Sequence, residues 1–143
     1  AARPDIVLLQ AHLSNEAMRR LMASADIVVS LHRSEGFGLF LAEAMWLGKP
    51  VVGTGWSGVM DFMDEESCGL VRFKLVDAGA DAGPYQGGRW AEADVDHAAA
   101  LLRRLVEDEA HRAEMGRRAK AKAEAVFALE RWMDGVKGSL GLP

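Results

Sequence analysis

Two glutamates with a defined spacing lie in the segment RSEGFGLFLAEAM, residues 33–45. Glu35 precedes a turn that contains two glycines, and Glu43 follows after seven intervening residues, within an apolar stretch. A carboxylate accepts hydrogen bonds from hydroxyl groups, and a buried carboxylate needs such donors because its desolvation is costly. The pair is therefore a candidate site for a ligand that carries several hydroxyl groups.

The turn between the two glutamates can contact a ligand through its backbone. Gly36 and Gly38 let the main chain approach a ligand closely, because neither residue has a Cβ atom. A helix is expected to begin at Gly38, and its first N–H groups, those of Gly38, Leu39 and Phe40, have no partner within the helix. Such groups can hold an anionic or hydroxylated ligand.

The immediate neighbours of Glu43 predict that its side chain is at least half buried, because all of them are apolar: Leu41, Ala42, Ala44 and Met45. The vicinal diol of a ribose would satisfy both carboxylate oxygens, and each such hydrogen bond is worth about 1.5–3 kcal/mol. These residues together describe a nucleotide-sugar pocket, with the sugar at Glu35 and the diphosphate at the helix start. A purely structural interpretation stays open, in which Glu43 only pairs with Lys49 or Arg33.

The elements that would position this site alternate between short apolar runs and helical patterns over residues 1–76. This alternation is typical of βαβ units and predicts an α/β fold with a short parallel sheet of about four strands. The predicted strands are residues 5–10, 25–32, 50–55 and 68–76. Ligands of such sheets bind at the carboxyl ends of the strands, where the Glu35 segment is expected.

The helices are marked by their caps. Ser14 is expected to cap a helix over 14–24, and Gly48 is expected to end the helix that begins at Gly38. Residues 77–93 are rich in glycine and small side chains and are predicted to form a long loop. A helical tail then covers 94–143, with three predicted helices: one capped by Asp94, one over 110–126, and one over 129–140.

Bulk composition indicates one globular domain over the whole chain of 143 residues. The net charge of −4 gives no electrostatic case for binding nucleic acid. No apolar run approaches the length of a membrane span. Cys68 is the only cysteine, which is typical of a reducing cytoplasm, and we expect it to be a small buried residue at the start of a strand.

The sequence lacks the motifs of several other kinds of functional site. The four histidines are scattered at positions 12, 32, 97 and 111, so no metal site is expected. A dinucleotide-binding turn of the form G-x-G-x-x-G is absent after every predicted strand. A phosphoacceptor domain would need acids at the carboxyl ends of strands, whereas Asp5 and Asp26 stand at strand starts.

Three motifs resemble the carboxyl-terminal half of the group 1 glycosyltransferases, which are retaining enzymes of the GT-B fold. The motifs are SEGFGL at 34–39, LAEAMWLGKPVVGTGWSG at 41–58 and CGLVRF at 68–73. The family motif has two glutamates separated by seven residues, with a glycine–aromatic–glycine turn after the first. The resemblance implies a Rossmann-like, three-layer αβα donor domain, and it is specific from about Asp26 to Gly69.

The resemblance also implies roles for individual residues. Glu35 would be the catalytic residue that contacts the transferred sugar, and Glu43 would bind the donor ribose. Further donor contacts would come from Gly36, Phe37, Gly38 and Leu39. Gln10 and His12 would lie beside the nucleotide base. Two roles stay open: His32 is either a pocket residue or a strand end, and Trp56 either lines the sugar pocket or only packs. No cofactor is implied, because the nucleotide-diphosphate sugar is the substrate.

The chain also departs from the family. The amino-terminal acceptor domain is missing, as are the first two βα units of the donor domain with their basic pair, so we expect this fragment to be inactive alone. The missing strands leave open edges at 5–10 and 25–32. We expect these two segments to pair with each other, or two chains to join as a homodimer through them.

Two alternative functions and an expected cellular location follow from the same sequence features. A GT-B-type sugar-nucleotide epimerase would bind the same class of donor, and a non-catalytic interaction module would keep only the fold. The expected location is cytoplasmic, and peripheral attachment to the inner membrane face through the missing domain stays open.

Overall fold

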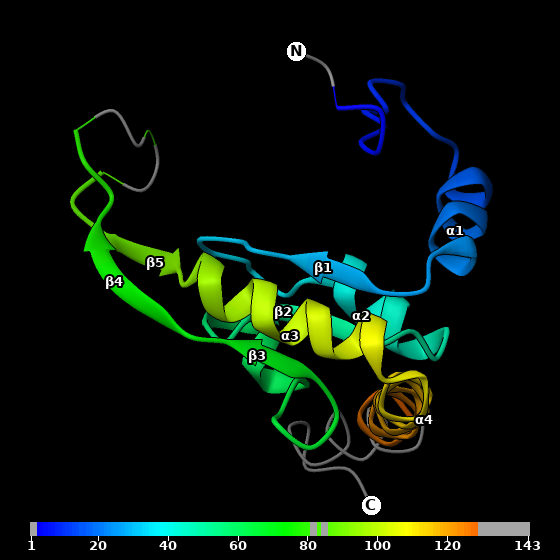
Figure 1. Ribbon diagram of the computed structural model, residues 1–143. Coiled ribbons are helices and arrows are strands. Elements are labelled where there is room, and N and C mark those ends of the chain that lie inside the picture. The colour runs from blue at the N-terminus through cyan, green and yellow to red at the C-terminus, as the bar shows by residue number, and fades with distance from the viewer. Residues whose placement is uncertain (1–2, 81–82, 84–85, 129–143) are drawn as a thin grey trace, which may run out of the picture.

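The computed structural model describes residues 3–80, 83 and 86–128 (Figure 1). Along the chain the elements are α1 (Asn15–Ser24), β1 (Val28–Ser30), α2 (Leu39–Trp46), β2 (Val51–Thr54), the 3-10 helix η1 (Ser57–Asp61), β3 (Gly69–Val71), β4 (Phe73–Asp77), β5 (Arg89–Ala93), α3 (Val95–Glu107) and α4 (Glu109–Val126). This is the mixed α/β fold that the sequence predicts.

The three central strands form a parallel sheet in the order β1-β2-β3. Neighbouring residues of β2 point to opposite faces, as strand geometry requires. Val51 packs in one core cluster with residues of α2 and α4, whereas Val52 packs in a second cluster with Ala98 and Leu105 of α3. The chain therefore has three layers, with α3 on one face of the sheet and α2 and α4 on the other.

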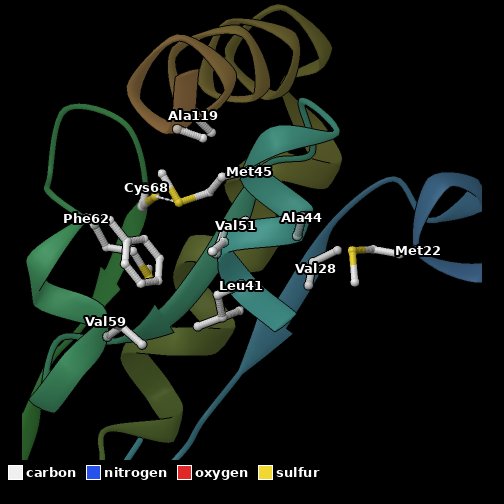
Figure 2. Packing of buried hydrophobic residues seen from close by; sticks show 13 residues of the cluster. Met22, Val28, Leu41, Ala44, Met45, Val51, Val59, Phe62, Cys68 and Ala119 are labelled. Carbon is white, nitrogen blue, oxygen red and sulfur yellow. Dashed lines mark hydrogen bonds between the residues drawn. The ribbon is translucent and has the colours of Figure 1, made fainter. Parts of the chain in front are cut away.

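The larger core cluster lies between α2 and the sheet (Figure 2). Leu41, Ala44 and Met45 of α2 point toward Val51, and all four side chains are at most 2% exposed. Cys68 closes the cluster as the predicted small buried residue before β3, with its Sγ atom 3.7 Å from Sδ of Met45.

The predicted helix caps are confirmed. The Ser14 side chain accepts a hydrogen bond from the Ala17 N–H at 3.2 Å, and Asp94 accepts one from the His97 N–H at 2.9 Å. Gly38 adopts the left-handed conformation directly before α2, at a φ of 88°, and Gly48 does so after it, at 72°. Both positions favour glycine, because a side chain is strained at positive φ.

The predicted strand at residues 5–10 is wrong. The segment forms no strand, and four consecutive side chains are 57% to 81% exposed: Ile6, Val7, Leu8 and Leu9. The expected pairing with 25–32 within one chain is also wrong, because β1 pairs only with β2 in the part of the chain that the structure describes. A continuous apolar run forms a buried strand only where neighbours cover it, and here none does.

The predicted loop over 77–93 is wrong at its carboxyl end. Arg89–Ala93 forms β5, which pairs with β4 as an antiparallel hairpin, and the glycine-rich residues lie at its tip. Because residues 5–10 form no strand, the parallel sheet has three strands among the described residues rather than about four. The helix predicted over 129–140 lies outside the described residues. Within them, no helix is long and apolar enough to span a bilayer.

Candidate functional site

The Glu35 main chain is held by the loop that follows β2. Its N–H donates to Oγ of Ser57 at 2.9 Å, and its carbonyl oxygen accepts from the Gly58 N–H at 3.0 Å. The Glu35 residue itself is exposed to solvent. Two loops at the carboxyl ends of β1 and β2 thus fix the backbone of this glutamate, while its carboxylate stays accessible to a ligand.

Two glycines make this close approach possible. A Cβ atom on Gly58 would overlap the carbonyl oxygen of Gly36, and one on Gly38 would lie 2.5 Å from Cγ1 of Val59. Ser57 is also left-handed, at a φ of 67°, which is unusual for a residue with a side chain. The turn therefore has a defined shape set by contacts with η1.

The start of α2 offers backbone donors. The N–H groups of Leu41 and Ala42 both donate to the carbonyl of Gly38, at 3.0 and 3.1 Å. Those of Leu39 and Phe40 donate to no acceptor among the described residues. Partnerless N–H groups at a helix N-terminus attract anions, so this end of α2 suits a phosphate.

Phe37 anchors the turn to the core. Its ring centroid lies 5.3 Å from that of Phe62 and 5.9 Å from that of Phe127, yet 41% of the residue remains exposed. Leu39, two residues further along and the first residue of α2, is 67% exposed. Phe37 thus combines a packing role with an accessible edge beside the helix start.

The expectation that Glu43 is at least half buried is wrong, because Glu43 is exposed. Leu41 and Met45 of α2 are buried in the core, whereas Glu43 shares the outer face of that helix with Leu39 and Trp46. It lines a shallow hollow of about 220 Å³ whose other walls are apolar: Phe37, Leu39, Ala42, Trp46 and Phe127. A ligand that entered this hollow would find a single carboxylate on an apolar wall.

The two cations near the glutamates are engaged elsewhere. An Arg33 Nη atom lies 3.0 Å from a carboxylate oxygen of Glu92, and Lys49 Nζ donates to the carbonyl of Ala23 at 2.5 Å. The structural interpretation in which Glu43 pairs with Arg33 or Lys49 is therefore wrong. Glu43 has no ion pair within the described ranges.

His32 and Trp56 connect neighbouring loops. One ring nitrogen of His32 lies 3.3 Å from Oγ of Ser30, and the other lies 3.2 Å from the carbonyl oxygen of Trp56. The Trp56 ring packs on Phe73, with the centroids 5.4 Å apart. Both residues are partly buried. These contacts support packing for Trp56, and a pocket role for either residue stays a prediction.

Gln10 and His12 are not brought to the glutamates. Both are exposed in the segment before α1, and neither forms a hydrogen bond with any described residue. Figure 1 shows this segment standing apart from the sheet. Their predicted place beside a nucleotide base remains a prediction.

Sequence reasoning missed the roles of Ser57 and Gly58, and of the β5 residues that contact Arg33. The signal for the first pair was the Ser-Gly dipeptide shortly after the predicted strand at 50–55, which is typical of a tight turn. Across the described part of the chain, no group of three or more His, Cys, Asp or Glu side chains is arranged to hold a metal ion.

A comparison with known protein families identifies the family of the chain. The family model described as "Glycosyl transferases group 1" matches residues 4–122. Since that match covers most of the 143 residues, the chain belongs to the group 1 glycosyltransferases.

Individual relatives carry related names. The chain is 33% identical over 124 residues to a D-inositol 3-phosphate glycosyltransferase of Paenarthrobacter aurescens, covering 82% of this chain and 26% of that protein. It is 30% identical over 131 residues to a trehalose synthase of Rubrobacter xylanophilus, covering 90% of this chain and 26% of that protein. A trehalose synthase of Pyrococcus horikoshii is 42% identical over 50 residues, covering 34% of this chain and 12% of that protein. The chain therefore spans about a quarter or less of the length of these relatives.

Proposed function

We propose that the chain supplies the donor-binding half of an enzyme that transfers a sugar from a nucleotide diphosphate to a hydroxyl acceptor with retention. Glu35 contacts hydroxyls of the transferred sugar and acts as the catalytic residue. Glu43 accepts hydrogen bonds from the ribose diol, and the start of α2 receives the diphosphate. The relatives named as glycosyltransferase and trehalose synthase support glycosyl transfer as the reaction class.

One observation carries the proposal: in the βα unit after parallel strand β1, Glu35 lies in the turn before α2 and Glu43 lies one turn into that helix, and both residues are exposed. Ligands of parallel α/β sheets bind at this end of the strands. Oriented N–H groups can stabilise the negative charge that develops on the diphosphate as the glycosidic bond breaks. The two carboxylates can then hold the sugar and the ribose through their hydroxyls.

The proposal includes inactivity of the isolated chain. Arg33 and Lys49 already have partners, so the cation that neutralises the leaving diphosphate must come from outside these residues. A hydroxyl acceptor also needs a second wall opposite the glutamates, and the longer relatives have room for one. Both requirements are consistent with a fragment that binds the donor without turning it over.

Product analysis tests the reaction. The 143-residue chain and the longer enzyme that contains it would each be incubated with UDP-glucose or GDP-glucose, and free UDP or GDP would be measured. We expect release only by the longer enzyme, and an α-linked product from the α-linked donor by proton NMR. Turnover by the chain alone, or an inverted product, would contradict the proposal.

A further inference from the structure

The β4–β5 hairpin contacts the segment that carries Glu35. The Ala91 N–H, in β5, donates to the carbonyl oxygen of Arg33 at 2.8 Å. Ala91 is fully buried, and Arg33 precedes Glu35 by only two residues. The backbone before the catalytic candidate is therefore tied to a strand that follows it by more than fifty residues.

The residues on both sides of Ala91 bind the Arg33 side chain. The guanidinium carbon lies 4.9 Å from the ring centroid of Trp90, a distance typical of a cation–π interaction. A guanidinium nitrogen lies 3.0 Å from a carboxylate oxygen of Glu92. Ala91 therefore donates to the Arg33 carbonyl, Glu92 pairs with the Arg33 charge, and the Trp90 ring lies against the guanidinium group.

A second contact joins the same hairpin to the opposite loop. Phe73, the first residue of β4, packs against Trp56, and the Trp56 carbonyl lies within hydrogen-bond distance of His32. Since Ser57 and Gly58 hold the Glu35 main chain, both loops around Glu35 contact the hairpin. The pairing of β4 with β5 makes these two contacts parts of one unit.

We propose that Trp90 and Glu92 are positioning residues that fix Glu35 for sugar transfer by clamping Arg33. The inference rests on the proposed function, because positioning matters only if Glu35 contacts the sugar. The clamp also assigns a role to Arg33: it holds the loop instead of binding the diphosphate. A displaced carboxylate would lose hydrogen bonds that matter in the transition state, so the clamp acts on turnover.

Amide hydrogen exchange tests the clamp in the 143-residue chain itself, by NMR. Trp90→Ala should speed exchange at Ala91, Glu35 and Gly58 by about two- to fivefold, the range of an exposed cation–π contact. Trp90→Phe keeps an aromatic face and should restore most of the protection. Glu92→Gln should act like Trp90→Ala, whereas Asp77→Asn, which removes a charge at the far end of the hairpin, should leave these amides unchanged.

Kinetics of the longer enzyme give the second readout, with UDP-glucose and GDP-glucose as probes. Trp90→Ala and Glu92→Gln should lower kcat by about two- to fivefold with an unchanged donor KM, and Trp90→Phe should recover kcat. A raised KM at constant kcat, or no recovery by phenylalanine, would overturn the positioning role.

The two readouts separate this inference from the proposed function. If the longer enzyme uses neither probe but the exchange pattern is as expected, the hairpin holds the Glu35 loop, while the proposed reaction with these donors fails and the positioning role in it fails too. If the enzyme is active while Trp90→Ala changes neither exchange nor kcat, the clamp fails and the proposed reaction stands. Unchanged melting temperatures in all four variants would show that the effects do not come from unfolding.

Discussion

The N–H of Gly58 donates to the carbonyl oxygen of Glu35, 3.0 Å away, and the two residues belong to loops that follow different strands. Gly58 lies so close to the Gly36 carbonyl that even one additional carbon would overlap it. The glycine after β2 therefore sets the position of the glutamate after β1.

The first prediction concerns this contact. Gly58→Ala should lower the free energy of unfolding by about 1–3 kcal/mol, as overpacking does, because the Glu35 loop must move away. Gly36→Ala is the matched control for stability, since no atom lies within 4 Å of its added Cβ, and it should change stability by less than about 0.5 kcal/mol. Urea denaturation measures both. Equal effects would mean that the contact does not fix the loop.

The second prediction separates the two glutamates in the longer enzyme. Glu43→Gln should weaken donor affinity by about 1.5–3 kcal/mol, the value of hydrogen bonds to a charged group. We expect the lower end, because Glu43 is exposed and must lose its own water on binding. Glu35→Gln should instead lower turnover more than affinity, because it contacts the group that changes in the transition state.

Steady-state kinetics and donor titrations check these two substitutions. Glu65→Gln, which neutralises an exposed glutamate outside the candidate site, should change neither quantity. The opposite pattern, with affinity lost at Glu35 and turnover lost at Glu43, would mean that the two roles are assigned the wrong way round.

The third prediction concerns the buried thiol. Burial, the largest effect, raises the pKa of Cys68 to about 11, whereas an unfolded thiol titrates near about 8.5. At pH values between these two, the Cys68 thiol is deprotonated in the unfolded chain but still protonated in the folded chain. The contribution of Cys68 to the free energy of unfolding should therefore fall as the pH rises from about 8.5 to about 11. The free energy of unfolding, measured at several pH values in this range, should fall less steeply for Cys68→Ala than for the unmodified chain. Equal slopes would indicate that Cys68 is accessible.

The fourth prediction concerns association of the 143-residue chain. Ile6–Leu9 is an exposed apolar segment, and β1 has an open edge among the described residues, so we expect two chains to join through them. Light scattering should give a mass above that of one chain. Val7→Lys together with Leu9→Lys should reduce that mass. Val106→Lys should not, although Val106 on α3 is 66% exposed, between the 57% of Leu9 and the 81% of Val7. A monomeric unmodified chain would rule out this association.

Local signals predicted most of the elements around the site. Ser14 and Asp94 were recognisable as helix caps because their side chains satisfy N–H groups three residues ahead. Gly38 and Gly48 marked the two ends of α2 in the sequence, because glycine is favoured at the positive φ angles that both residues adopt. The position of Glu35 at a glycine turn before a helix followed from these signals alone.

The wrong predictions have two causes: the face of a helix on which a residue lies, and contacts that are distant in sequence. Glu43 was expected to be at least half buried because its chain neighbours are apolar, but helical periodicity puts Leu41 and Met45 on the face opposite to Glu43. The run at 5–10 has the composition of a buried strand, yet composition does not show whether neighbouring strands exist. Glycines at the hairpin tip obscured β5, whose pairing with β4 is a tertiary feature.

The central claim is that this chain binds the nucleotide diphosphate of a sugar donor at the start of α2. Titration calorimetry of the 143-residue chain with UDP and with GDP tests it most directly. The account predicts heat with at least one of the two, reduced by Glu43→Gln and unchanged by Glu65→Gln. No heat with either nucleotide, or equal heat from the wild type and Glu43→Gln, would contradict it.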